Sequence, residues 1–324
     1  MSKFSTYQLS DGGLYIGELN DNGLPHSSLA TCTWPNGTTY RGSWINGTMC
    51  GVGTMYENGA IKYRGYWWKG ELIHIFGTEE PPRPETKLPK NKNKIAALLV
   101  GCSYEDGDKP LPCCVHEVDE IGKKMSEIGI DVTVLKNATR DEIQQGLIEL
   151  SKKNEKFDHA IFYFSGHGAI LGGYHVLLDI ESELMALETN VIRTFNGTNY
   201  KNIIIVHDAC NVILPISQET IDKLHERGEQ MYENNQTQAR NVLYAFSSLN
   251  GYPSIGALDD DLGMFALAFI ENIQKKNVPV IKMFDNITRF VLDYSQKVCG
   301  RYIEIPNVTK VMFDEDFCLY EPEE

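Results

Sequence analysis

The sequence predicts an α/β domain built on a mostly parallel sheet, preceded by a small all-β domain. Three observations lead to this prediction: a repeat of about 23 residues early in the chain, a proline-rich stretch after it, and strand–helix alternation from there onward. The chain has 324 residues, of which 42% are apolar and 23% are charged, so it is long enough to bury a core in each domain.

The composition also limits the function and the compartment. A net charge of −14 disfavours binding to nucleic acid or to an anionic membrane, and no apolar run is long enough to span a bilayer. The polar start of the chain lacks the charged-then-apolar order of a signal peptide. Eight cysteines without a C-x-x-C pair predict neither a disulfide framework nor a zinc site. We therefore expect a cytoplasmic protein with reduced thiols and no transmembrane segment.

Residues 1–77 contain a repeat built on tyrosine and glycine. Its central triplet, tyrosine–x–glycine, begins at Tyr15, Tyr40 and Tyr63. The dipeptides Asn36-Gly37 and Asn58-Gly59 separate short aromatic and β-branched runs, which is a strong signal for tight hairpin turns. The repeat therefore predicts one hairpin per unit, with neighbouring units stacked so that they bury what one hairpin cannot.

This pattern resembles the MORN repeat family, whose repeats follow YxGxxxxGxxxGxG, and the resemblance covers residues 13–77. It implies dimerisation, docking of a regulatory partner or binding to membrane lipid. A plain hairpin stack that serves as a spacer or an interface is the alternative, and we favour it over lipid binding because few basic residues lie there. The four tryptophans are expected to stack in the core of this domain rather than to form a ligand cage: Trp34, Trp44, Trp67 and Trp68.

A linker is expected between the two domains. Residues 78–94 read TEEPPRPETKLPKNKNK and contain four prolines with almost no large apolar side chain. Such a segment cannot bury enough surface to fold alone. We place the linker at residues 78–92 and the second domain at residues 93–324.

The second domain alternates apolar runs with amphipathic ones. Near-continuous apolar runs predict strands that are buried on both faces of a sheet, at residues 94–101, 131–135, 158–164, 202–207, 241–247 and 310–320. Amphipathic helices are expected at residues 116–128, from the capping box at Thr139 onward, and at 219–234, 261–275 and 281–298. This alternation predicts a parallel sheet covered by helices on both faces, with ligands at the carboxyl ends of the strands.

Two reactive side chains follow neighbouring strands at that edge. The stretch SGHG places His167 just after the third strand, and the stretch DAC places Cys210 just after the fourth. Because adjacent parallel strands lie about 4.8 Å apart, both side chains are expected on the same rim of the sheet. A thiol beside an imidazole forms a thiolate–imidazolium pair, which is the usual means by which sulfur attacks a carbonyl at neutral pH.

The glycines that flank the histidine have predicted roles of their own. Gly166 allows a sharp turn that exposes His167. Gly168 leaves its backbone N–H uncovered, so that it can donate to an oxyanion that forms beside Cys210. The N–H of Cys210 itself is the natural second donor.

The combination of SGHG and, 43 residues later, DAC resembles the caspase-like cysteine peptidases. The resemblance covers residues 93–321 and includes the stretches Leu243–Ser248 and Ile305–Tyr320, which are similar to the substrate-loop strand and the closing strand of that family. It implies the caspase-hemoglobinase fold, with a six-stranded mostly parallel sheet between helices. It also implies that His167 and Cys210 form the catalytic dyad.

The resemblance is closer to metacaspases and paracaspases than to true caspases. Caspases have glutamine two residues before the cysteine and bind aspartate through arginines, whereas this chain has Asp208 there and no arginine in the loop 251–256. The family's second acid corresponds to Glu117, and Ser165 corresponds to a residue of the pocket wall. The sequence therefore predicts protein substrates that are cleaved after arginine, with lysine second.

Plainer interpretations of these acids stay open. In the alternative interpretation, Asp208 is a carboxylate that orients or caps a local group. An acid near a helix amino end, such as Glu117, is favoured by the helix dipole in any case. The stretch Asp179–Glu183 lacks the paired aspartates of the calcium-dependent metacaspases, and residues 259–261 resemble a helix cap. We therefore expect no metal, no calcium requirement and no other cofactor.

The main rival function is a catalytically silent caspase-fold scaffold that binds partners through the repeats. Because such pseudoenzymes usually lose the histidine or the cysteine, the presence of both favours the enzyme. An α/β hydrolase or a nucleotide-binding fold is excluded on motifs, since neither GxSxG nor a glycine-rich phosphate loop follows a strand. The polar stretch 218–240 is long enough to be a loop for self-cleavage, and the last strand could pair two copies of the chain.

Overall fold

The computed structural model describes residues 5–78, 88–105, 107, 109–215, 241–251, 254, 262–300 and 304–323. The chain forms two compact units, residues 1–86 with 296–300 and residues 87–295 with 301–324. Most of the predicted linker, the helix predicted at 219–234, the stretch 218–240 proposed for self-cleavage and the aspartates 259–261 lie outside the described residues. Within the described part of the chain, no helix is long and apolar enough to cross a membrane.

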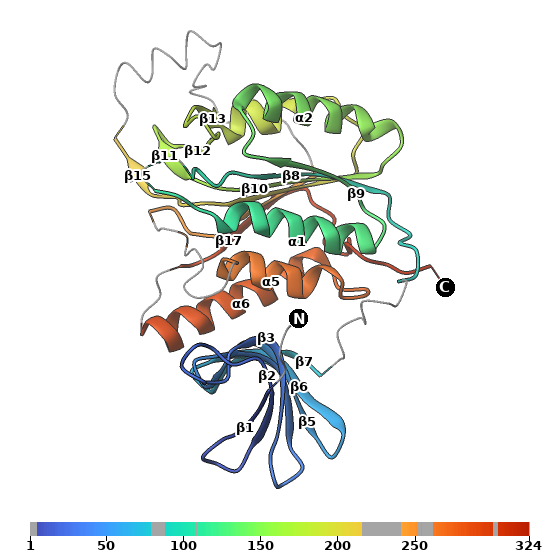
Figure 1. The fold of residues 1–324 in the computed structure, drawn as a ribbon. Helices are drawn as coiled ribbons and strands as arrows, with labels where there is room; N and C mark the ends of the chain where they lie inside the picture. Colours follow the sequence, from blue (N-terminus) through green and yellow to red (C-terminus); the bar gives the residue numbers. More distant parts are fainter. Residues whose placement is uncertain are drawn as a thin grey trace. The chain divides into compact units, whose positions relative to one another are not determined.

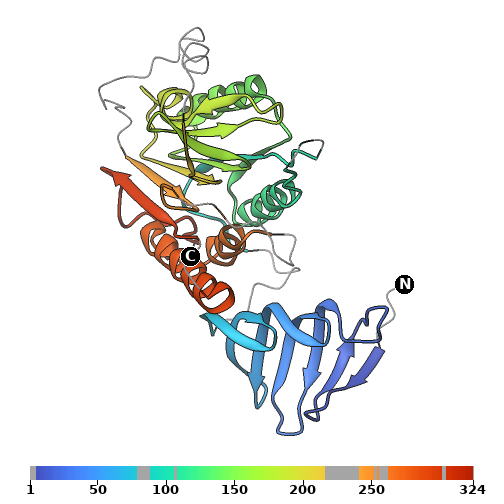
Figure 2. The same ribbon diagram turned by 90° about the vertical axis from the view of Figure 1, so that its left-hand side faces the viewer.

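The N-terminal unit contains an antiparallel sheet of seven strands that follow one another in sequence order (Figure 2). Three of its turns, at Asn46-Gly47, Asn58-Gly59 and Lys69-Gly70, have positive φ at both residues, the geometry that matches the twist of hairpin strands. The hairpins expected from the repeat are therefore present, while their identification as MORN repeats stays a prediction. The strands are β1 (Ser5–Gln8), β2 (Leu14–Gly17), β3 (Ser27–Thr33), β4 (Thr39–Ile45), β5 (Thr48–Glu57), β6 (Ala60–Trp68) and β7 (Glu71–Gly77).

The tyrosine–x–glycine triplet has a steric reason in this sheet. Gly42 of β4 lies opposite Gly53 of β5, and the Tyr40 side chain occupies the space above this pair. A Cβ on Gly53 would lie 2.3 Å from the Tyr40 hydroxyl oxygen. The same hydroxyl donates to the Ser43 carbonyl at 3.2 Å. Two of the four tryptophans lie in the buried core around it. The residues of this core are Tyr15, Ala30, Cys32, Tyr40, Trp44 and Trp67.

The second unit is built on a six-stranded sheet whose strand order is β17-β16-β14-β10-β8-β9. Every neighbouring pair is parallel except β16 and β17, which are antiparallel. The first five predicted strands match the observed ones to within about a residue at each end. The strands are β8 (Ile95–Gly101), β9 (Asp131–Lys136), β10 (His159–Ser165), β14 (Asn202–Asp208), β16 (Val242–Phe246) and β17 (Asn307–Val311).

Helices cover both faces of this sheet (Figure 1). Helix α2 (Arg140–Lys152) lies on one face and begins with the predicted capping box, in which Thr139 and Glu142 exchange hydrogen bonds. Helices α1 (Cys113–Glu127) and α5 (Met264–Ile273) lie on the other face, and α6 (Val280–Cys299) packs on α5 through Phe284 and Phe269. Short helical turns occur at Lys153–Glu155, Leu187–Val191 and Ile192–Thr194.

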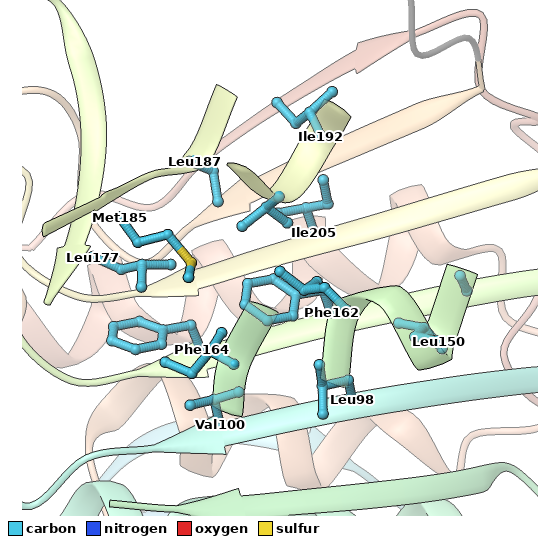
Figure 3. Packing of buried hydrophobic residues seen from close by; sticks show 14 of the residues in the cluster. Leu98, Val100, Leu150, Phe162, Phe164, Leu177, Met185, Leu187, Ile192 and Ile205 are labelled. Atoms are coloured by element: carbon cyan, nitrogen blue, oxygen red, sulfur yellow. The ribbon is translucent and has the colours of Figure 1, made fainter. Parts of the chain in front are cut away.

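The alternation of side chains along the strands explains why the strand runs are apolar throughout. Figure 3 shows Leu98, Phe162 and Ile205 in one buried cluster with Leu150 of α2. Their neighbours in sequence point to the opposite face, where Tyr163 packs against Phe269 of α5. Side chains on both faces of the strands are therefore buried, as expected for a central parallel sheet.

A second, smaller sheet lies beyond the carboxyl ends of β10 and β14, and the sequence did not predict it. Its strand order is β13-β12-β11-β15. Strand β11 begins directly after the histidine of SGHG and pairs in parallel with β15, which follows the cysteine of DAC. The small sheet thus links the two loops that carry these residues. Its strands are β11 (Gly168–Leu171), β12 (Tyr174–Leu178), β13 (Leu184–Ala186) and β15 (Ile213–Leu214).

The prediction of a strand at 310–320 is wrong in its placement. The closing strand is Asn307–Val311, and the following apolar residues Phe317 to Tyr320 are buried without joining the sheet. Side-chain amides satisfy part of their backbone instead: Asn91 donates to the Leu319 carbonyl at 2.6 Å, and Asn93 donates to the Cys318 carbonyl at 2.9 Å. Burial without a ladder partner gives the same apolar pattern as a strand.

Candidate active site

The pairing of two strands brings the histidine and the cysteine to one rim. Strands β10 and β14 are in parallel register, with Ser165 opposite Asp208. His167 and Cys210 each lie two residues beyond this last pair, so the chain leaves the sheet at the same level on both strands. Both side chains are partly exposed. The structure therefore places the two predicted catalytic residues on adjacent loops at the carboxyl edge of the sheet.

Gly168 is packed closely against the cysteine loop. A Cβ on Gly168 would lie 2.8 Å from the Ala209 Cβ, 2.9 Å from the His207 Cε1 and 3.0 Å from the Cys210 carbonyl oxygen. Real Cβ atoms do not approach their neighbours this closely. Glycine is therefore required here for the contact between the two loops.

The strand pairing also fixes the direction of the Gly168 N–H. In β11, the N–H of Ile170 donates to the Val212 carbonyl at 2.9 Å, on the side of the cysteine loop. Because N–H groups two residues apart along a strand point to the same side, the N–H of Gly168 also points toward that loop. This orientation is the one that an oxyanion donor beside Cys210 requires.

The imidazole of His167 has one nitrogen already engaged. Its Nε2 lies 2.7 Å from the backbone carbonyl oxygen of Lys109. Since a carbonyl can only accept, Nε2 carries the proton in this contact. In the neutral ring, Nδ1 is then the nitrogen that can accept a proton from a thiol.

The surroundings of Cys210 keep its thiol protonated at rest. Burial raises the pKa of Cys210, the nearby carboxylates of Glu304 and Asp208 raise it further, and the Lys109 ammonium lowers it. The Cys210 Sγ lies 4.0 Å from the Ser254 carbonyl oxygen. Formation of the thiolate therefore needs a base, and the rim offers His167 for this role.

A buried acid group lies beneath this rim. The Ser165 hydroxyl donates to Glu117 Oε2 at 2.5 Å, and the N–H of Gly263 donates to Glu117 Oε1 at 2.7 Å. Glu117 is only 3% exposed. Burial raises its pKa well above the usual range for glutamate, and the neighbouring Asp208 raises it further. The three residues predicted to form a substrate pocket, Glu117, Ser165 and Asp208, are thus brought together.

Asp208 is held by hydroxyl groups. The Tyr163 hydroxyl donates to Asp208 Oδ2 at 2.8 Å, and Ser254 Oγ lies 3.4 Å from Asp208 Oδ1. Burial raises the pKa of Asp208, while the hydrogen bonds from Tyr163, Ser247 and Ser254 lower it. The carboxylate therefore sits where an ionised state is costly unless a cation arrives.

A third carboxylate of this group, Glu304, was not predicted from the sequence. Glu304 is completely buried, and its Oε1 lies 3.2 Å from the same Ser254 hydroxyl that contacts Asp208. The sequence signal was present, since Glu304 is the one charged residue in the apolar run Ile303-Glu304-Ile305. It was missed because the residue lies far along the chain from the other acids.

One further predicted detail, the role of Gly166, changes. Gly166 does not have a positive φ, so a sharp glycine turn is not its role. A Cβ there would instead lie 2.8 Å from the Tyr104 hydroxyl oxygen, so the position requires space for that group. Asp179, considered for calcium, accepts hydrogen bonds from the backbone N–H groups of Arg140, Glu181 and Glu183. Among the described residues, no group of three or more His, Cys, Asp or Glu side chains is arranged to hold a metal ion.

Comparison with known proteins agrees with this architecture. The family model of the caspase domain matches residues 94–318 of the chain. Among solved structures, caspase-1 from Spodoptera frugiperda is similar, with a TM-score of 0.51 and 14% sequence identity over 76% of this chain and 98% of that chain. At this identity the likeness concerns the fold. A search of the curated proteins found no match.

Proposed function

The chain belongs to the caspase-domain family of cysteine peptidases, and we propose that it is an endopeptidase that cleaves protein substrates after basic residues, arginine before lysine. The observation that carries this proposal is the group of buried carboxylates, Glu117, Asp208 and Glu304, beside Cys210. Ionised carboxylates are costly to bury, and a cationic side chain of a ligand offsets that cost.

The proposed chemistry uses His167 and Cys210 as base and nucleophile. The thiol proton moves to Nδ1 of His167 while the sulfur adds to the carbonyl carbon of the substrate. The N–H groups of Gly168 and Cys210 donate to the resulting oxyanion. The carbon–nitrogen bond breaks as the imidazolium gives its proton to the leaving amine. Water then attacks the thioester, His167 takes its proton, and the thiol is restored as the acid product leaves.

The hydrogen bonds in the acid group support a cationic ligand. The Ser254 hydroxyl oxygen lies 3.4 Å from Asp208 Oδ1 and 3.2 Å from Glu304 Oε1, so two buried carboxyl groups lie around one hydroxyl group. A guanidinium group has five N–H donors in a planar fork, whereas an ammonium group is a compact point charge. Arginine at the residue before the cleaved bond (P1) therefore satisfies these acids better than lysine.

The test compares fluorogenic peptides that differ only at P1, with arginine, lysine, citrulline or aspartate. Citrulline has the shape of arginine without its charge, so it isolates the electrostatic contribution. We expect arginine to be preferred over lysine, and both over citrulline and aspartate. Asp208→Asn and Glu304→Gln should each reduce the arginine-to-citrulline ratio of kcat/KM by about tenfold or more, while Glu149→Gln on α2 should not change it. A preference for aspartate, or equal use of citrulline, would exclude this pocket.

A silent scaffold is the second candidate, and one experiment separates it from the enzyme. A peptidyl-arginine electrophile should label Cys210 in the native protein. It should label Cys210 more slowly in the His167→Ala variant. Absence of both labelling and hydrolysis would favour the scaffold. In either case we propose that the N-terminal repeats localise or regulate the protein by docking a partner or a second copy of the chain.

A further inference from the structure

The hydroxyl group of Tyr104 takes part in the strand pairing at His167. Strands β11 and β12 are antiparallel with Gly168 opposite Leu177, so that His167 lies opposite Leu178 in the same register. The N–H of Leu178 donates to the His167 carbonyl at 3.0 Å. In an antiparallel ladder, such a pair normally exchanges two hydrogen bonds, so the His167 N–H would donate back to the Leu178 carbonyl.

Tyr104 replaces that second bond. The His167 N–H donates to the Tyr104 hydroxyl oxygen at 3.1 Å, and the same hydroxyl donates to the Leu178 carbonyl at 2.5 Å. One phenol group is therefore inserted where the direct strand bond would form. The distance by which β11 separates from β12 at His167 is set by this group.

The Tyr104 ring also contacts the imidazole itself. The two ring centroids lie 4.4 Å apart with an interplanar angle of 37°. Burial raises the pKa of Tyr104, so the phenol stays neutral and keeps the proton that it donates. Gly166 leaves room for the hydroxyl, since a Cβ at Gly166 would lie 2.8 Å from it.

Tyr104 and Lys109 belong to the same loop, which connects β8 to α1. This loop is closed by a bond from the Leu111 N–H to the Ser103 carbonyl at 2.6 Å. It is anchored at Asn137, whose side-chain oxygen accepts from the Ser103 N–H at 2.8 Å. One anchored loop thus contacts the backbone N–H, the ring face and the Nε2 of His167.

We propose that Tyr104 is a positioning residue that sets both the location and the ring orientation of His167. The proposal rests on the proposed function, because it assumes that His167 acts as the base for Cys210. The phenol holds the backbone of His167 away from Leu178 and supports one face of the imidazole. Nε2 then meets the Lys109 carbonyl, and Nδ1 remains the nitrogen that accepts the thiol proton.

The test uses two substitutions of Tyr104 and a matched control. Tyr104→Phe keeps the ring and removes the bridging hydroxyl, and Tyr104→Leu removes both. The control is Tyr200→Phe, because the Tyr200 hydroxyl also donates to a backbone carbonyl, that of Leu150, at the same distance of 2.5 Å. Tyr200 lies in the cluster beside α2 and makes no described contact with His167. Thermal unfolding of all three variants measures the general loss of stability.

The deciding measurement is the ¹⁵N chemical shift of the His167 ring in protein labelled at histidine, with His167→Gln used for assignment. These shifts report which ring nitrogen carries the proton. We expect the Nε2–H form in the native protein and in Tyr200→Phe, and a mixture of the two neutral forms in Tyr104→Leu. For Tyr104→Phe we expect a partial change, with kcat on the P1-arginine peptide reduced about tenfold and KM almost unchanged.

The outcomes separate this proposal from the proposed function. If the native protein cleaves no basic-P1 peptide but Tyr104→Phe alters the ring shifts and Tyr200→Phe does not, the proposed function fails and the positioning role stands. If the native protein cleaves such peptides and Tyr104→Phe leaves the ring shifts unchanged, the positioning role is wrong, even where kcat falls. Equal changes in Tyr104→Phe and Tyr200→Phe would also overturn it.

Discussion

At the scale of single residues, the site is built from groups that are costly to bury. Glu117, Asp208 and Glu304 are at most 8% exposed, and burial raises the pKa of both Glu117 and Asp208. A carboxyl group with a raised pKa in the folded state contributes its full stability below its unfolded pKa and loses it as the pH rises through the folded value. At neutral pH the acid group therefore lowers the stability of the native protein.

The first prediction concerns this cost. Asp208→Asn cannot ionise and keeps an oxygen that can accept from Tyr163. We expect it to raise the free energy of unfolding at neutral pH by about 1 kcal/mol, or the melting temperature by about 2–4 °C, and to lose the gain near pH 4. Thermal unfolding across this pH range measures the change in stability. The control is Asp21→Asn, because Asp21 is exposed. A less stable Asp208→Asn protein at neutral pH would contradict the sign.

The second prediction concerns substrate binding at acidic pH. A P1 cation binds the ionised acids, and the raised pKa values of Glu117 and Asp208 mean that these groups take up protons at a higher pH than exposed carboxyl groups do. KM for the arginine peptide should therefore rise as the pH falls from about 8 to about 5, while KM for the citrulline peptide changes little. Parallel changes for both peptides would show that the acids do not contact P1.

Most residues of the candidate site could be predicted from the sequence because they lie in two short motifs after strands, and their catalytic and binding roles stay predictions. His167, Gly168, Asp208 and Cys210 are in those motifs. Tyr104 and Lys109 were not predicted, because each contributes through a contact that crosses about 60 residues of chain and depends on how one loop folds back. Glu304 was missed for the same reason.

At the scale of elements, the small sheet β13-β12-β11-β15 holds together the two loops that carry His167 and Cys210. Its strands have two to five residues each, too short for the alternation that identifies a strand in sequence. The strands of the large sheet were predicted well because each is a long apolar run, and the closing strand was misplaced because a buried coil carries the same pattern. The length and burial of an apolar segment can be predicted from the sequence, but the hydrogen-bond partners of its backbone cannot.

The third prediction belongs to this scale. Gly168→Ala should force β11 and the cysteine loop apart, since the new Cβ would lie 2.8–3.0 Å from three atoms. We expect kcat to fall by about tenfold to a hundredfold. Gly173→Ala is the control, because its φ of +89° adds strain in the β11–β12 turn while no atom lies within 4 Å of the new Cβ. It should lower the melting temperature and retain kcat; equal losses of kcat in both would refute the role of Gly168.

At the scale of the whole molecule, the described site is confined to the second unit. Its residues come from positions 104 to 304, and none comes from the seven-stranded sheet of residues 5–77. The chemistry on a short peptide should therefore be a property of the second unit alone. The repeats are then expected to influence the choice of protein substrate and not the chemical step.

The fourth prediction tests this division. Gly53→Ala should destabilise the N-terminal sheet by about 1–3 kcal/mol, because its Cβ would lie 2.3 Å from the Tyr40 hydroxyl oxygen. Hydrolysis of a P1-arginine peptide should stay within about twofold of the native rate. The control is Gly59→Ala in the β5–β6 turn, which has no atom within 4 Å of its new Cβ. A large loss of peptide hydrolysis in Gly53→Ala alone would place part of the site in the repeats.

The peptidase unit begins and ends at the same place. The N–H of Lys92 donates to the Glu321 carbonyl at 2.7 Å, and the N–H of Glu323 donates to the Lys90 carbonyl at 2.7 Å. Since its two ends are already hydrogen-bonded to each other, this unit is suited to circular permutation, with a short bridge joining residues near 323 to residues near 88 and a new start opened in a distant surface loop. Any module fused after residue 323 would likewise emerge beside residues 90–92 of the same unit.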